Sequence, residues 1–141
     1  MRYVLDVSAA LCWVLPRAAS ARAVRLRDEH SQNVHSLIAP SIFPAEAASA
    51  LTKAERQKLI AVGEGSLLLA DILASLPVMH PYEPLLARAV NISSQSRGGL
   101  YDCLYIALAE RERCQFVTDD QKLIANLASQ YSFIVSLASL P

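Results

Sequence analysis

Five acidic residues lie beside the ends of short apolar segments: Asp6, Glu46, Asp102, Asp119 and Asp120. The first follows the run RYVL, and the last two follow QFVT, both of which are rich in residues that favour β-strands. The other two fall near the starts of segments whose apolar residues have helical spacing. In an open parallel α/β sheet, ligands bind outside the carboxyl ends of the strands. We therefore expect carboxylates from four segments of the chain to converge on one edge of a sheet.

Carboxylates that converge in this way need a positive charge between them. Two of them about 5 Å apart repel by about 3 kcal/mol at an effective dielectric constant of about 20. The histidines and cysteines are scattered without ligand-pair spacing, so the donors are oxygens, which suit Mg²⁺ or Mn²⁺ rather than Zn²⁺. Such a cation activates water and offsets charge on a phosphodiester during hydrolysis. Ser8 and Thr118, each two residues from an acid, are expected to hold carboxylates in place.

Each acid taken singly also has a purely structural interpretation. Asp119 or Asp120 suits the N-cap of a helix that begins at Gln121, because a carboxylate there accepts hydrogen bonds from backbone N–H groups. Glu46 and Asp102 suit the positive end of a helix dipole. The sequence leaves these interpretations open, and convergence of the acids in space is what would favour a metal site.

Short strand-forming runs alternate with helical segments along the whole chain. The expected strands are residues 2–5, 36–39, 76–80, 115–118 and 132–135. The expected helices are residues 8–15, 18–32, 41–58, 66–75, 84–96, a segment that opens near residue 100, and 121–130. This alternation predicts an α/β fold with about five parallel strands and helices on both faces of the sheet. No linker or internal repeat divides residues 1–141, so we expect one domain.

Composition limits the classes of protein to which the chain can belong. Its formal net charge is zero over 141 residues, so any nucleic-acid contact has to come from local basic patches. The three cysteines cannot all pair, which fits free thiols in a reducing cytoplasm. No apolar stretch is long enough to span a membrane, and the run LLLADILASL is interrupted by Asp71. We expect a cytoplasmic protein without a membrane segment.

Three blocks of the sequence resemble the PIN-domain family and, within it, the small ribonuclease toxins of the VapC type. The opening strand, Asp-x-Ser/Thr and helix of that family are similar to YVLDVSAALCWVL, and its Pro-then-Glu helix is similar to IAPSIFPAEAASAL. Its most specific block, with Y-D-x-x-Y-x-A-L-A and then V-T-x-D, is similar to YDCLYIALAERERCQFVTDDQKL. The order matches along the whole chain. Ser49, where Asn is frequent, and Gly98-Gly99, where a Ser or Thr cap is frequent, depart from the pattern without removing an acid.

The resemblance implies a metal-dependent endoribonuclease, the toxin of a type II toxin–antitoxin pair. The residues implied to be catalytic and to bind Mg²⁺ or Mn²⁺ are Asp6, Glu46, Asp102 and Asp120. Asp119 falls at the variable position of V-T-x-D, so we count it, with Ser8 and Thr118, as a supporting residue.

The resemblance also implies partners. These are an RNA substrate, a cognate antitoxin protein, and a second copy of the chain joined through helices like 41–58 and 66–75. Three basic residues near the acids in sequence are candidates for phosphate contacts: Lys53, Arg97 and Lys122.

Other assignments are weighed against this one. A haloacid-dehalogenase-like phosphatase would have Asp-x-Asp after the first strand, where this chain has Ser8 as the third residue. A receiver domain would have a lysine at the end of a late strand, whereas Lys122 falls in a predicted helix. A non-catalytic PIN-like protein that only binds RNA or a partner stays as the main alternative.

Overall fold

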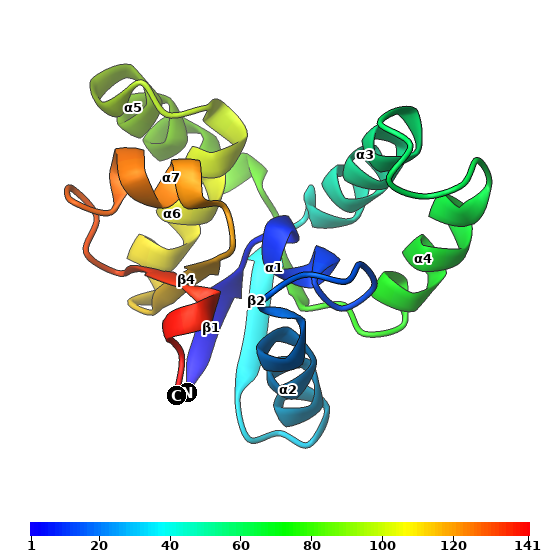
Figure 1. Ribbon diagram of the computed structural model, residues 1–141. Coiled ribbons are helices and arrows are strands. Elements are labelled where there is room, and N and C mark those ends of the chain that lie inside the picture. Colours follow the sequence, from blue (N-terminus) through cyan, green and yellow to red (C-terminus); the bar gives the residue numbers. More distant parts are fainter.

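Strands and helices alternate along all of residues 1–141, which the computed structural model describes (Figure 1). The strands are β1 (Arg2–Leu5), β2 (Ser36–Pro40), β3 (Val78–His80), β4 (Gln115–Thr118) and β5 (Ile134–Ser136). The α-helices are α1 (Val7–Leu11), α2 (Ser20–Ser31), α3 (Phe43–Arg56), α4 (Glu64–Leu73), α5 (Leu86–Ser96), α6 (Leu100–Glu112) and α7 (Gln121–Leu127). Two 3₁₀ turns, η1 (Glu83–Leu85) and η2 (Leu137–Ser139), complete the chain. None of the helices combines the length and the apolar character needed to cross a membrane.

The five strands form one parallel sheet in the order β3-β2-β1-β4-β5. The chain builds the sheet outward from β1 through β2 to β3, and then returns to the other side of β1 for β4 and β5. The two directions of winding therefore meet between β1 and β4, which is the switch point where such sheets bind ligands. Leu5 is paired with Val117, so the residues that follow β1 leave the sheet beside the end of β4.

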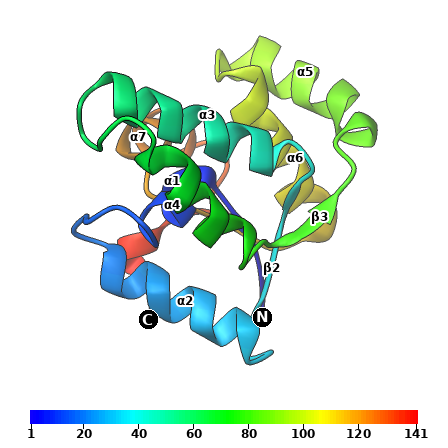
Figure 2. The ribbon, with the colours of Figure 1, turned by 90° about the vertical axis from the view of Figure 1, so that its right-hand side faces the viewer.

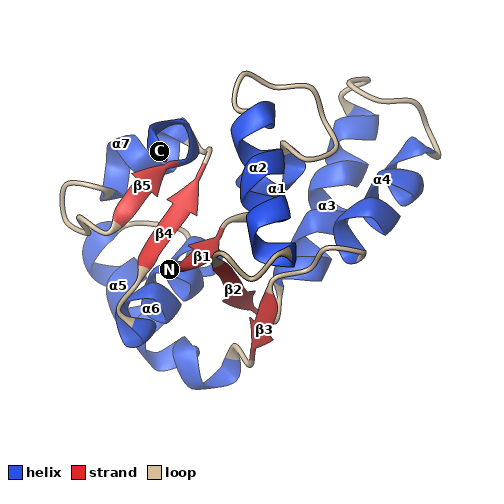
Figure 3. Cartoon of the chain, turned by 90° about the horizontal axis from the view of Figure 1, so that it is seen from below, coloured by secondary structure: helices blue, strands red, loops and turns tan.

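Helix α6 is buried on all sides. Every residue from Cys103 to Ala109 is buried, because the helix packs against β1, β2 and β4 while α5 covers its outer side. A helix that is apolar all round has to lie between two layers. Figure 3 shows α5 and α6 on one side of the sheet and α1 to α4 on the other. The predicted parallel sheet with helices on both faces is confirmed.

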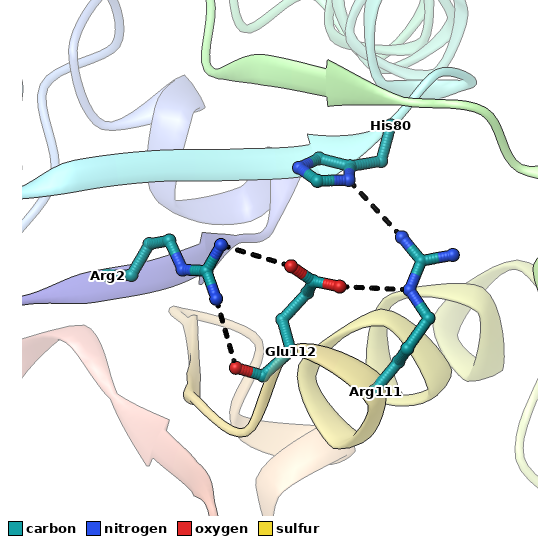
Figure 4. A network of polar contacts seen from close by, with 4 residues as sticks. All are labelled: Arg2, His80, Arg111 and Glu112. Carbon is teal, nitrogen blue, oxygen red and sulfur yellow. Dashed lines mark hydrogen bonds and ion pairs between the residues drawn. The ribbon is translucent and has the colours of Figure 1, made fainter.

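A polar network holds the C-terminal end of α6 against the sheet (Figure 4). Glu112 Oε1 accepts a hydrogen bond from Arg2 Nη1 of β1 at 3.0 Å, and its Oε2 accepts one from Arg111 Nε at 3.0 Å. Arg111 Nη2 also lies 3.2 Å from Nδ1 of His80, which must accept because a guanidinium only donates. Partly exposed ion pairs of this kind are worth about 0–1 kcal/mol each, so the network orients α6 more than it stabilises the fold.

Helices α3 and α4 pack against each other and form an arm beside the sheet (Figures 1 and 2). The turn between them is held by Glu55, whose Oε2 accepts the N–H groups of Gly63 and Gly65 at 3.1 and 2.7 Å. Gly63 has φ of 91°, a left-handed conformation that glycine adopts without strain. A Cβ atom at Gly65 would lie 2.6 Å from the Glu55 carboxylate, so a larger residue there would displace this carboxylate from its present position.

Several elements, among them β3, β5 and α1, differ in extent from their predictions. β3 begins at Val78 instead of residue 76, because Pro77 has no N–H to donate, and it lies at the sheet edge. β5 covers Ile134–Ser136, two residues later than its predicted start. α1 ends at Leu11 instead of residue 15, and Trp13 beyond it donates its Nε1–H to the carbonyl of Ala23 in α2 at 3.0 Å. The departure from helix lets this buried indole join α1 to α2.

Candidate functional site

Acidic residues from four segments gather at the carboxyl edge of the sheet, next to the switch point. Asp6 directly follows β1, and Asp120 lies two residues beyond the end of β4, where it is the N-cap of α7. Glu46 and Asp102 occupy the first turns of α3 and α6. Electrostatic repulsion links all four, because Asp6, Asp120 and Glu46 each raise the pKa of Asp102. The topology, which returns the chain to β1 after β3, brings these distant segments to one edge.

Asp6 is the most buried of these acids, with 7% of its surface exposed. Its Oδ2 accepts hydrogen bonds from the hydroxyls of Ser8 and Thr118, each at 2.7 Å. The two hydroxyls lie 3.1 Å apart, and both donate their single proton to Asp6. Their oxygens in turn accept the backbone N–H groups of Asp119 and Asp120, at 2.9 and 3.0 Å. The two residues predicted to support the site thus tie the end of β1 to the chain that leaves β4.

Burial raises the pKa of Asp6 above its ordinary value, and the negative charge of Asp120 raises it further. The hydrogen bonds from Thr118 and Ser8 lower the pKa and oppose this shift, because they favour the ionised form. The hydroxyl pair therefore favours the ionised form of a buried carboxylate.

Glu46 is held by a tyrosine on α6. Its Oε1 accepts a hydrogen bond from Tyr105 Oη at 2.7 Å, while the Tyr105 ring stacks on Phe116 of β4 with centroids 5.7 Å apart. Burial and the charge of Asp6 raise the pKa of Glu46, and the Tyr105 bond opposes them. No role for Tyr105 was predicted from the sequence. A signal exists, because it lies three residues after Asp102 on one helix and so faces the same side.

No interaction lowers the pKa of Asp102, in contrast to Asp6 and Glu46. Burial and the charges of Asp6, Asp120 and Glu46, in that order, raise its pKa to about 7. No lysine or arginine contributes to lowering it, and each ion pair in the protein involves other acids. This carboxyl therefore holds its proton up to a higher pH than an ordinary aspartate does.

The two adjacent acids after β4, Asp119 and Asp120, have different hydrogen-bond partners. Asp120 Oδ1 accepts the N–H groups of Lys122 and Leu123 at 3.0 and 3.1 Å, so the N-cap interpretation holds for this residue. Only one of its oxygens is used in the cap. Asp119 Oδ2 instead accepts a hydrogen bond from the thiol of Cys12 at 3.4 Å. Burial and this carboxylate raise the pKa of Cys12 to about 12, so the thiol stays protonated as the donor.

Two cavities border the acids and share Asp120. One, of about 530 Å³, is lined by Asp102 and Asp120 together with Arg97 and Lys122. The other, of about 630 Å³, is lined by Glu46, Asp120 and Lys53. The three basic residues named from the sequence therefore all line a cavity that an acid also lines.

The donor chemistry of the site fits a hard divalent cation. The candidate donors are all carboxylate oxygens. Burial first, and then the negative charges of neighbouring acids, raise the pKa values of Asp6, Glu46 and Asp102. No three side chains of the types His, Cys, Asp or Glu are grouped so as to hold an ion together. Mg²⁺ usually keeps several waters and uses only one or two carboxylates, so this spacing fits a hydrated ion.

The pH dependence of stability tests the electrostatics of this site. In EDTA, raising the pH from about 5 to about 8 is expected to destabilise the protein by about 1–2 kcal/mol through Asp102. Its folded pKa of about 7 exceeds the value of about 3.9 expected for the unfolded chain, so unfolding releases a proton between these values and the stabilisation is lost as pH rises. Thermal melts across this range measure the effect. An unchanged midpoint, or one that rises with pH, would contradict it.

Replacement of Tyr105 by Phe tests the support of Glu46. The ring and its stacking on Phe116 remain, while Glu46 loses its hydrogen bond. Loss of a residue that orients a metal ligand typically costs about 10-fold to 100-fold in metal affinity or activity. We expect a shift of that size in the Mg²⁺ concentration that gives half-maximal activity. Tyr131→Phe, which removes a hydroxyl without a hydrogen-bond partner elsewhere, is the matched control, and an equal response of both variants would argue against the role.

The fold and this edge define an α/β domain with a carboxylate site at the switch point of a parallel sheet. The model of the PIN domain matches residues 3–128. The chain therefore belongs to the PIN-domain family. It is 37% identical over 122 residues to "Ribonuclease VapC12" of Mycobacterium tuberculosis, which covers 85% of this chain and 88% of that protein. It is 28% identical over 125 residues to "Ribonuclease VapC3" of Pyrobaculum aerophilum, with 87% and 92% covered. The resemblance seen in the three sequence blocks is confirmed.

Solved structures share the fold. The crystal structure of PAE2754 from Pyrobaculum aerophilum superposes with a TM-score of 0.71 at 21% identity, covering 99% of this chain and 94% of that one. VapBC2 from Rickettsia felis, solved bound to a DNA fragment from its promoter, superposes with a TM-score of 0.61 at 15% identity, covering 96% and 97%. At these identities the likeness concerns the fold.

Proposed function

We propose that this chain is a metal-dependent endoribonuclease that hydrolyses RNA phosphodiester bonds and is the toxin of a type II toxin–antitoxin pair. The observation that carries the proposal is the convergence of carboxylates from four segments on the switch point, none of which takes part in an ion pair. The substrate class is supported by relatives that are named VapC ribonucleases. The proposal treats residues 1–141 as one PIN-like nuclease domain.

Four residues are proposed to be catalytic and to hold Mg²⁺ or Mn²⁺: Asp6, Glu46, Asp102 and Asp120. When bound, a divalent cation lowers the pKa of a coordinated water and offsets charge on a phosphodiester. The protein's own part is to keep the carboxylates ionised and oriented. Ser8 and Thr118 do this for Asp6 by donating to one of its oxygens, and Tyr105 does it for Glu46. Asp119 supports the site from its contact with Cys12.

The proposal includes a cognate antitoxin protein and a homodimer joined through α3 and α4. Support comes from large apolar side chains that are exposed on and around this arm: Leu59 at 65%, Val62 at 90%, Leu67 at 71% and Leu73 at 44%. Apolar surface gathered in one region is typical of protein–protein contact sites. The proposal also places the protein in the cytoplasm, which the three free cysteines support.

Cleavage assays with and without metal test the proposed function. Purified protein is incubated with RNA in EDTA, in Mg²⁺ and in Mn²⁺, beside the Asp6→Asn variant. We expect cleavage only with metal, and loss of cleavage in the variant, because Asn has no charge to bind the cation. Asp28→Asn on α2, whose carboxylate is exposed, is the matched control. Cleavage in EDTA, or equal cleavage by Asp6→Asn, would overturn the assignment.

One observation favours the alternative of a non-catalytic PIN-like protein that binds RNA or a partner. No three potential ligands are grouped to hold an ion together. This alternative predicts RNA or antitoxin binding that is indifferent to Mg²⁺ and Mn²⁺, with intact RNA after incubation. The same assay therefore separates the two functions.

A further inference from the structure

Two cavities lie beside the acids and share one lining residue. The first lies between the end of α5, the start of α6 and α7, and the second lies between α3 and the start of α6. Asp120 lines both of them. Volumes of about 630 and 530 Å³ lie within the range of about 300–1,000 Å³ typical of cavities that hold small molecules, so each has room for a nucleotide unit.

Along the second cavity, one face of α3 carries side chains that change from acidic to basic. Glu46, Ser49, Lys53 and Arg56 follow one another at spacings of three, four and three residues, which places them on the same side of the helix. All four line this cavity. With a rise of about 1.5 Å per residue, the basic end lies about 15 Å from the acidic end. The face thus leads from the carboxylates outward to two cations.

Those two cations are free to bind a ligand. Lys53 and Arg56 are exposed, and neither takes part in any ion pair or side-chain hydrogen bond of the protein. The nearby Glu55 is occupied by the backbone of the turn between α3 and α4. Unpaired cations in a row that starts at a phosphodiester-cleaving site suit the successive phosphates of a nucleic-acid strand.

Tyr101 lies across the cavity from this face. It is in the first turn of α6, directly before Asp102, and lines the same cavity as Lys53 and Arg56. Its side chain is 60% exposed, and its ring stacks on no other aromatic residue. Exposed aromatic rings beside a basic track are the surfaces on which unpaired bases stack, and such stacking tolerates any base.

We propose that the cavity between α3 and α6 binds an unpaired segment of RNA, with a base stacked on Tyr101 and the flanking phosphates on Lys53 and Arg56. The inference rests on the proposed function, because the acids define where the scissile phosphodiester lies. It assigns Tyr101 and Arg56 to substrate binding. A duplex keeps its bases stacked on one another and so cannot offer one to Tyr101.

Binding of a labelled single-stranded oligoribonucleotide tests this inference. The measurement uses the Asp102→Asn background in Mg²⁺, so that the RNA stays intact. Adding Tyr101→Ala is expected to weaken binding about 5-fold to 150-fold, the range for loss of one stacked base, and Tyr101→Phe is expected to recover most of the loss. With Asp102 restored, Tyr101→Ala should raise KM more than it lowers kcat.

The salt dependence of RNA binding distinguishes the contribution of the Tyr101 ring from those of Lys53 and Arg56. Lys53→Gln and Arg56→Gln should each reduce the slope of log affinity against log salt by about 0.7, the value for one phosphate contact on a single strand. Tyr101→Ala should weaken binding without changing this slope, because no phosphate contact is lost. Lys58→Gln is the matched control, since Lys58 is exposed at the end of the same arm but does not line the cavity.

An oligoribonucleotide with one abasic position completes the test. At the stacked position, removal of the base should cancel the effect of Tyr101→Ala, whereas at other positions the effect should persist. If wild-type protein cleaves RNA but Tyr101→Ala binds it normally, the inference fails and the proposed function stands. If Tyr101→Ala instead weakens only antitoxin binding, the cavity is a protein contact. If wild-type protein neither binds nor cleaves RNA, the proposed function itself fails.

Discussion

Asp102→Asn is expected to lower RNA cleavage by more than about 100-fold while making the metal-free protein more stable. Removing a residue that merely orients a metal ligand costs about 10-fold to 100-fold, so the loss of a proposed ligand should exceed that range. The gain in stability has a separate cause. Asp102 makes no side-chain hydrogen bond, and burial together with three neighbouring acids raises its pKa to about 7. The neutral amide removes this repulsion without removing any contact inside the protein.

The size of the stabilisation follows from the shifted pKa. We expect about 1–2 kcal/mol at about pH 8, allowing for the partial exposure of the carboxyl to solvent. For a chain of this length this corresponds to a rise of about 3–8 °C in Tm. Melts in EDTA measure it, and repeat melts in Mg²⁺ should stabilise the wild type more than the variant, because a ligand stabilises only the state that binds it. A variant that melts lower than wild type in EDTA, or that cleaves RNA normally, would contradict the prediction.

Thr118→Val is expected to destabilise the fold by about 3 kcal/mol, or about 10 °C in Tm. Thr118 is fully buried, and Val has nearly the same shape, so the change removes the hydroxyl alone. Asp6 loses one of its two hydroxyl donors, at a cost of about 1.5–3 kcal/mol for a bond to a charged group. The N–H of Asp120 loses its acceptor, which adds about 1–3 kcal/mol if the group stays buried. Activity should fall too, because the pKa of Asp6 rises further.

Thr118→Ser separates the hydroxyl from the rest of the side chain. It keeps both hydrogen bonds and loses one methyl group, so we expect a cost of only about 1 kcal/mol. A double-mutant cycle of Thr118→Val with Asp6→Asn should show a coupling energy of at least about 1 kcal/mol, since the two residues are in direct contact. Equal destabilisation by Val and Ser would mean that packing, and not hydrogen bonding, explains the burial of Thr118.

Local patterns in the sequence predicted most of the fold. The runs RYVL and QFVT are strands β1 and β4 with the predicted bounds, because β-branched and aromatic residues bounded by Asp favour a short buried strand. Pro77, which cannot donate within a sheet, is compatible with the position of β3 at the sheet edge. The ends of elements were predicted less well where a distant contact decides them. α1 stops at Leu11 so that Trp13 can reach Ala23, and nothing within the helix itself encodes that partner.

Part of the candidate site was likewise predicted from the sequence, and part of it depends on tertiary contacts. That acids would follow β1 and β4 was predicted from the sequence, because a residue directly after a strand has a defined place in a parallel sheet. That Ser8 and Thr118 donate to the same oxygen of Asp6 depends on β1 and β4 being neighbours in register. The contact between Tyr105 and Glu46 joins residues 59 positions apart, and it needs α3 and α6 to meet at one edge.

The sequence by itself therefore determined the elements, the parallel α/β class and the identities of the candidate acids, because these depend on residue type and spacing along a few turns. Only the tertiary structure decided the strand order, the different partners of Asp119 and Asp120, and the lack of a counter-charge beside Asp102. The physical reason is that hydrogen bonds and repulsion act over a few ångströms of space. The residues they join come from segments that the chain brings together only after β4 inserts beside β1.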